Sequence, residues 1–185
     1  PSVNLLKETL ELPDQDFLEW FWLKDTYKAP AEVPTILILH GLEGCARSNY
    51  VQDLMRQLGS LGWRAVVKQY RNRGEKPNRL AQSYHAMRWQ ELDWTVENFR
   101  GRFPEAPIGV VGFSIGGSIL LNWLGQNEIK NIAAACAISV PYKLAPCADR
   151  LNKGFSKIYQ TYLMGRLKSS AVRKWALLKD ALGLS

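Results

Sequence analysis

A serine between glycines, in the stretch Gly112-Phe113-Ser114-Ile115-Gly116, is the part of this sequence best suited to covalent chemistry. The G-x-S-x-G spacing is typical of a serine on a sharp strand-to-helix turn, because small residues on either side let the strand and the helix approach. A helix that starts there favours negative charge beside the serine. We therefore predict that Ser114 is a catalytic nucleophile supported by Gly112 and Gly116. The alternative is a small residue at a tight packing point.

A second turn, His40-Gly41-Leu42, ends the apolar run PTILILHG upstream of the serine. Acyl-transfer enzymes place one backbone N–H of an oxyanion hole at such a turn, and each donor contributes roughly 10²–10³ in rate. We predict that the backbone N–H groups of Leu42 and Ile115 form the oxyanion hole, with His40 and Gly41 supporting the turn. A nucleotide-binding strand end is less consistent with the sequence, because neither G-x-G-x-x-G nor a P-loop lysine follows.

The chain has two histidines, His40 and His85, that could activate a serine. We expect His40 to hold its own turn by hydrogen bonding. His85 follows the run ending near Tyr70, so we expect it to be a structural or pocket-lining residue, and only secondarily a base. Asp149 and Asp180 follow Ser114 but lie in a basic helical stretch, which makes either a poor candidate for the acid of a triad.

Elements of strand and helix length alternate from residue 35 onward, after a predicted hairpin, ETLELPDQDFLEWFWLKD. This alternation predicts an α/β fold with a mostly parallel, doubly wound sheet and helices on both faces. Chemistry in such sheets sits at the carboxyl ends of the strands. Cys136 lies in an apolar run, so we expect it in the core. The expected strands are PTILILHG, WRAVVKQY, APIGVVGF and NIAAACAISV, and the expected helices are SNYVQDLMRQLGSLGW, RWQELDWTVENFRGRF and SIGGSILLNWLGQ.

The character of the chain changes near residue 141, so we divide it into a core, residues 1–140, and a basic helical segment, residues 141–185. The second segment carries 9 basic and 2 acidic residues, which accounts for the net charge of +7. Such a tail can bind nucleic acid or an anionic membrane surface. Its aromatic residues follow a helical spacing, which favours packing over base stacking. We expect no nucleic-acid partner, and peripheral contact with lipid stays open.

Composition bounds the remaining expectations. The sequence is 46% hydrophobic and 22% charged, and its three cysteines show neither C-x-x-C nor metal-ligand spacing. We therefore expect no metal and no cofactor. No apolar run reaches the roughly 18 residues of a membrane span, and the start lacks the features of a signal peptide. These observations predict a cytoplasmic protein.

Five motifs together resemble one known family, namely HGLEG, YRNRGEKPNR, the pair Tyr84-His85, GFSIGG and KGFSKIYQTYL. They resemble the α/β-hydrolase superfamily, and more narrowly the bacterial predicted-hydrolase branch of AB hydrolase family four, which is related to abhydrolase-domain lipases and esterases. The resemblance implies ester hydrolysis by a Ser-Asp-His triad with Ser114 as nucleophile. It also implies that residues from about 141 begin a helical cap, with the acid and the base beyond it.

Two functions follow as hypotheses. The first is a serine hydrolase for carboxylic esters, for which this chain supplies the nucleophile and the oxyanion hole and lacks the acid and the base. The second is a non-catalytic α/β-hydrolase-like binding or interaction module. The apolar run NIAAACAISV would be the outer strand, so we expect a further C-terminal part or another chain to complete the sheet.

Overall fold

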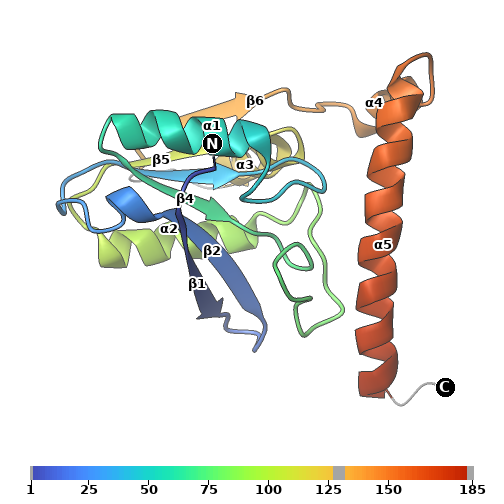
Figure 1. The fold of residues 1–185 in the computed structure, drawn as a ribbon, viewed down its shortest axis with the longest axis horizontal. Helices are drawn as coiled ribbons and strands as arrows, with labels where there is room; N and C mark the ends of the chain where they lie inside the picture. The colour runs from blue at the N-terminus through green and yellow to red at the C-terminus, as the bar shows by residue number, and fades with distance from the viewer. Residues whose placement is uncertain (1, 127–131, 183–185) are drawn as a thin grey trace.

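The computed structural model describes the backbone of residues 2–126 and 132–182, with side chains up to residue 179. Within these residues six strands form one sheet in the order β1-β2-β4-β3-β5-β6 (Figure 1). The strands are β1 (Leu5–Glu11), β2 (Phe17–Leu23), β3 (Thr35–Leu39), β4 (Arg64–Lys68), β5 (Ile108–Phe113) and β6 (Ala134–Ile138). The helices are η1 (Lys24–Thr26), α1 (Asn49–Ser60), α2 (Gln90–Arg102), α3 (Ile115–Gln126), α4 (Leu144–Leu151) and α5 (Ser156–Leu182).

The predicted fold class is confirmed by the pairing of the strands. β1 and β2 form an antiparallel hairpin, and β2 joins β4 antiparallel. β3 pairs parallel with β4 and β5, and β5 pairs parallel with β6. Parallel neighbours need crossover connections, and here α1, α2 and α3 supply them. The result is a mostly parallel sheet in which the carboxyl ends of β3, β4, β5 and β6 lie on the same side.

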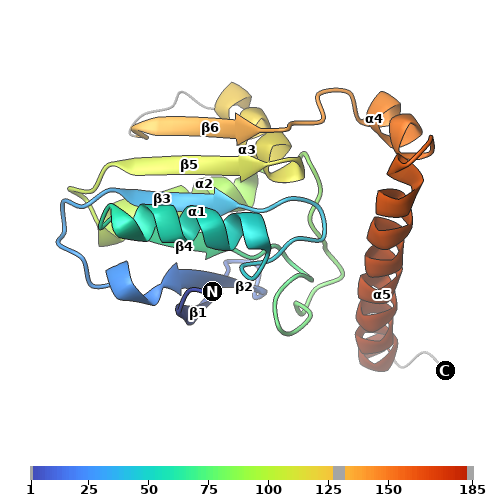
Figure 2. The same ribbon diagram turned by 45° about the horizontal axis from the view of Figure 1, so that its top comes forward.

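Alternation along β3 shows how the sheet is covered on both faces. Leu37 and Leu39 pack with residues of α2 and α3, such as Phe99. Ile36 and Ile38 belong to a separate cluster with residues of α1. All four β3 side chains are buried, as expected for a strand in the middle of a doubly wound sheet. Figures 1 and 2 show α1 on one face and α2 on the other.

The helix α5 lies beside the carboxyl ends of the strands and away from both covered faces of the sheet (Figure 2). Leu163 is buried, whereas Phe155 and Ile158 are 93% and 73% exposed. None of the helices in the described ranges is both long and apolar enough to cross a membrane. The basic segment therefore places one long helix over the edge of the sheet where chemistry is expected.

Cys136 does not lie in the core, so that expectation is wrong. β6 pairs only with β5 among the described strands and forms the edge of the sheet. Most of its residues, Cys136 included, are exposed. An apolar run signals a strand suited to burial, but burial also depends on which elements cover that strand.

A buried cluster of charges fixes the loop that follows β4. Lys68 Nζ lies 2.9 Å from Glu91 Oε2, and Arg71 bonds to both Glu91 and Asp16. Although burial opposes ionisation of Glu91, the neighbouring Lys68 and Arg71 cations hold its pKa at about 2. Removing one partner of such a buried ion pair strongly destabilises a protein, because the other charge is left buried without a counterion. The cluster ties the loop to α2 and to the start of β2, and so holds Arg73 near the end of β3.

Candidate active site

Ser114 occupies the turn between β5 and α3 in a strained backbone conformation. Its φ is +52°, in the left-handed region that residues other than glycine adopt rarely. The approach of the two elements leaves no room for side chains at the neighbouring glycines. A Cβ at Gly116 would lie 2.5 Å from the Leu39 carbonyl oxygen, and one at Gly112 would lie 2.6 Å from the Gly116 carbonyl oxygen. The glycine spacing therefore has the steric cause that the motif predicts.

The turn after β3 lies directly against Ser114. A Cβ placed on Gly41 would be 3.5 Å from the Ser114 Cβ. The Gly41 N–H donates to the Tyr50 hydroxyl at 2.8 Å, which fixes the turn. Neither the Leu42 N–H nor the Ile115 N–H donates to another of the residues described. Two unused backbone donors are thus present on the two segments that flank the serine.

A cavity of about 390 Å³ opens beside these groups. It is lined by the turn after β3, the ends of β5 and β6, and the first half of α5. The lining residues are Gly41, Leu42, Glu43, Gly44, Ser48, Tyr50, Phe113, Ser114, Ile138, Ser139, Tyr159, Tyr162 and Leu163. Ser114 therefore lines a cavity whose outer wall comes from the basic segment.

Glu43, the residue after Leu42, holds the turn in place with its side chain. It is 4% exposed, and its φ is +56°. Its carboxylate accepts hydrogen bonds from the Tyr84 hydroxyl at 3.0 Å and from the Ser170 hydroxyl at 3.2 Å, and it pairs with Arg73 at 2.8 Å. Its own N–H donates to the Tyr84 oxygen. We name these four residues the Glu43 clamp.

Sequence reasoning did not assign a role to the Glu43 clamp. Glu43, Arg73 and Tyr84 lie in motifs that resemble the family, but nothing in these motifs pairs the three residues with one another or with Ser170. Asn72 adds a second tie, because its side-chain amide donates to the Ser170 carbonyl at 3.2 Å. The clamp therefore connects the turn after β3, the loop after β4 and α5, which are far apart in the sequence.

Neither histidine of the chain lines the Ser114 cavity, as far as the described side chains show. His40 is fully buried, and its Nδ1 lies 2.9 Å from the Gly41 carbonyl oxygen. Burial lowers the pKa of His40 to about 3, so its ring is neutral near pH 7. His85 is exposed on the loop before α2. Asp149 is exposed on α4, and the side chain of Asp180 lies outside the described side chains.

The burial of His40 predicts a loss of stability in mild acid. Its pKa is about 3 in the folded chain and 6.5 when exposed, so unfolding takes up a proton between these values. Stability is therefore lost as pH falls below 6.5, by about 1.4 kcal/mol per pH unit. Urea unfolding of the whole protein should show a loss of about 2 kcal/mol between pH 7 and pH 5. His40→Gln should remove most of this loss and His85→Gln should keep it. An equal loss in all three proteins would contradict the assignment.

The parallel sheet and the strand–serine–helix turn define a class, and comparison with known proteins agrees with it. The chain belongs to the alpha/beta hydrolase fold family, whose model matches residues 34–185. This confirms the family expected from the sequence motifs.

Individual relatives are longer than this chain. It is 34% identical to the putative esterase YheT of Escherichia coli over 96% of this chain and 52% of that protein. It is 29% identical to human phospholipase ABHD3, over 94% of this chain and 44% of that protein. The chain thus spans about half the length of these curated relatives. The Pyrococcus furiosus esterase Pf2001 shares the fold, with a TM-score of 0.65 and 21% identity over 91% of this chain and 63% of that one.

Proposed function

We propose that this chain carries the nucleophile and the oxyanion hole of a hydrolase for carboxylic esters. The observation that carries the proposal is the position of Ser114. Its backbone φ is +52°, it lines a cavity, and two unused backbone donors lie beside it. The names of relatives support the same class, because they include an esterase, a phospholipase and the monoacylglycerol lipase of Saccharomyces cerevisiae. The last is 31% identical over 64% of this chain and 27% of that protein.

The proposed reaction proceeds by acyl transfer to Ser114. Its Oγ attacks the ester carbonyl carbon, and the Leu42 and Ile115 N–H groups stabilise the oxygen that becomes negative. Collapse of the tetrahedral intermediate expels the alcohol, which takes up a proton. Attack by water then releases the carboxylic acid and frees the serine.

The proton of Ser114 must be accepted by a group other than the two histidines of this chain. His40 has a pKa near 3 and its Nδ1 is paired with the Gly41 carbonyl, and His85 is exposed away from the cavity. We propose that, in the whole protein, a histidine outside these 185 residues takes this proton and gives it to the leaving alcohol. An acidic residue would orient that histidine.

The wall that α5 contributes suggests where the substrate lies. Tyr159, Tyr162 and Leu163 give the cavity an apolar side opposite the polar turn of Leu42. An acyl chain or an apolar alcohol would pack on this side while its carbonyl points to the backbone donors. We propose that α5 acts as part of a cap, and that substrates are small or acylglycerol-like esters.

The exposed face and edge of β6 suggest that the sheet extends in the whole protein. Its residues are mostly exposed although the run is apolar. We propose that further strands of the same protein, or another chain, pair with β6 and cover it.

A non-catalytic binding module is the second candidate, and one observation favours it. Among the described residues, no side chain accepts a hydrogen bond from the Ser114 hydroxyl. Without such a base, serine is a weak nucleophile at neutral pH. The cavity would then bind an ester or a similar apolar ligand without turnover.

The test is hydrolysis of p-nitrophenyl butyrate by the whole protein and by a variant in which one backbone amide nitrogen is replaced by oxygen. Replacing the amide of Leu42 by an ester removes its N–H and keeps the side chain. We expect kcat to fall by about 10²–10³-fold. The same replacement at Leu144, the exposed first residue of α4, is the control and should leave kcat unchanged. Absence of turnover in the wild type would contradict the hydrolase proposal, and an unchanged kcat would contradict the role of Leu42.

A further inference from the structure

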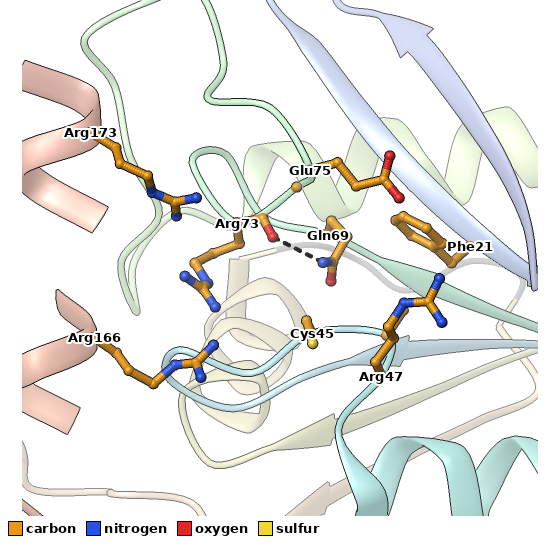
Figure 3. Close-up of a pocket in the computed structure, with 10 residues that line it drawn as sticks. Phe21, Cys45, Arg47, Gln69, Arg73, Glu75, Arg166 and Arg173 are labelled. Atoms are coloured by element: carbon orange, nitrogen blue, oxygen red, sulfur yellow. Dashed lines mark hydrogen bonds between the residues drawn. The ribbon is translucent and has the colours of Figure 1, made fainter. Parts of the chain in front are cut away.

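A second cavity, of about 250 Å³, lies next to the Ser114 cavity and is dominated by arginines (Figure 3). Arg47 precedes α1 and Arg73 follows β4, whereas Arg166 and Arg173 project from α5. We name the space between these four residues the arginine pocket. The volume is several times the roughly 30 Å³ that a water molecule occupies in the liquid, so a tetrahedral oxyanion fits.

Positive charge in the arginine pocket exceeds what its acidic neighbours neutralise. Arg73 pairs with Glu43 at 2.8 Å, and its guanidinium also donates to the Ser170 hydroxyl and to the Glu43 and Gly44 carbonyl oxygens. Arg166 and Arg173 form no ion pair within the described part of the chain. Arg166 donates to the Tyr162 hydroxyl at 3.1 Å, and its Nε is buried without a partner. In Figure 3 the guanidinium groups of Arg73, Arg166 and Arg173 point toward one another.

The acidic residue of the pocket is engaged elsewhere. Glu75 pairs with Lys7 at 2.6 Å, and Lys7 is the first cause of the lowered pKa of that carboxyl, with Arg47 contributing at longer range. In Figure 3 Arg47 extends toward Phe21 and Glu75. Arg47 itself has no ion pair within 4.0 Å among the residues described. Three of the four guanidinium groups therefore lack a contacting carboxylate.

Converging guanidinium groups repel one another unless an anion lies between them. The planar fork of arginine matches two oxygens of a phosphate, which makes the residue suited to this ligand. We propose that the arginine pocket binds a phosphate group, which Arg166 and Arg173 hold from α5 while the buried Arg73 adds positive charge from the core. The bound group would bridge the core and the helix.

The arginine pocket shares α5 and the turn after β3 with the neighbouring Ser114 cavity, so a ligand bound in the pocket would affect that cavity. Tyr162 lines the Ser114 cavity and accepts the hydrogen bond from Arg166. Gly44 lines the Ser114 cavity, and Cys45, the next residue, lines the arginine pocket. A phosphate in the pocket would hold α5 in its place as the outer wall of the Ser114 cavity. The site itself needs no chemistry at Ser114.

Calorimetric titration of the whole protein with inorganic phosphate tests the site. The double variant Arg166→Gln/Arg173→Gln should bind phosphate at least tenfold more weakly than the wild type. The control Arg150→Gln/Lys168→Gln removes the same charge from exposed positions on α4 and α5 outside the described lining and should bind as the wild type does. Thermal unfolding without phosphate checks that both variants are folded. Equal weakening in both variants would overturn the proposal.

The phosphate can come from a soluble compound or from a lipid headgroup, and vesicles separate these sources. Cosedimentation uses vesicles of phosphatidylcholine alone and of phosphatidylcholine with phosphatidylglycerol. If inorganic phosphate displaces the wild type from the vesicles, and only the Arg166→Gln/Arg173→Gln variant fails to bind them, the ligand of the pocket is a lipid headgroup. Phosphate binding without vesicle binding assigns it to a soluble phosphate compound. If neither inorganic phosphate nor vesicles bind the wild type, the proposal is wrong.

Ser114→Ala separates this inference from the proposed hydrolase. The variant should bind phosphate as tightly as the wild type, because the pocket and the serine use different residues. Failure of ester hydrolysis would therefore leave the titration interpretable. Loss of phosphate binding in Ser114→Ala would overturn the pocket as a separate site.

Discussion

Ser114→Ala is expected to lower kcat/KM for carboxylic esters by about 10⁴-fold or more in the whole protein, with the fold intact. The hydroxyl is the only group that the substitution removes, and the remaining oxyanion hole supports only residual catalysis. The substitution also keeps a side chain of similar size at φ +52°. Rates with p-nitrophenyl butyrate and far-ultraviolet circular dichroism measure the two parts of this prediction.

Ser118→Ala is the matched control for that variant. Ser118 lies one helical turn farther along α3, is 8% exposed, and its hydroxyl has no partner among the described residues. The substitution also removes a serine hydroxyl, but from a position that is not among the residues lining the cavity. We expect less than about a threefold change in kcat/KM, since Ser118 is not among the residues that line the Ser114 cavity and its hydroxyl has no hydrogen bond to lose among the described residues. Equal losses in both variants would show that α3, and not the Ser114 hydroxyl, carries the effect.

Glu43→Gln should destabilise the protein by about 3–5 kcal/mol. The substitution keeps the shape of the side chain but leaves Arg73, which is 8% exposed, as a buried charge without its carboxylate. It also weakens the acceptor for Tyr84 and Ser170. The free energy of unfolding in urea measures the loss.

Two variants distinguish loss of the ion pair from a general cost of substitution. Glu43→Gln/Arg73→Met removes both charges, so it should recover part of the stability lost in Glu43→Gln. Asp53→Asn breaks an exposed pair with Arg56 and should change the free energy of unfolding by less than about 1 kcal/mol. A Glu43→Gln protein as stable as Asp53→Asn would contradict the clamp.

The order of the elements and the steric role of the glycines could be predicted from the sequence. Strand and helix periods determine the alternation, and the G-x-S-x-G spacing follows from a contact of backbone with backbone at Gly112 and Gly116. These features are local, so short stretches of residues contain the information. The burial of β3 follows in the same way.

Features that depend on distant segments could not be predicted. Glu43 meets Ser170 across most of the chain, and its positive φ has no signature in the residue type. Cys136 was expected in the core because its run is apolar, but its strand forms the edge of the sheet. His85 follows β4 as expected, yet its side chain is exposed. In each case tertiary packing decides what periodicity leaves open.

The central claim, that Ser114 is a nucleophile, is tested most directly by a fluorophosphonate probe. Such a probe reacts with a serine whose hydroxyl is activated beside an oxyanion hole. The whole protein is incubated with the probe, digested, and mapped by mass spectrometry, with Ser114→Ala treated in parallel. We predict one adduct, on Ser114, that is absent from Ser114→Ala. No adduct on the whole protein, or equal labelling of Ser114→Ala, would contradict the account.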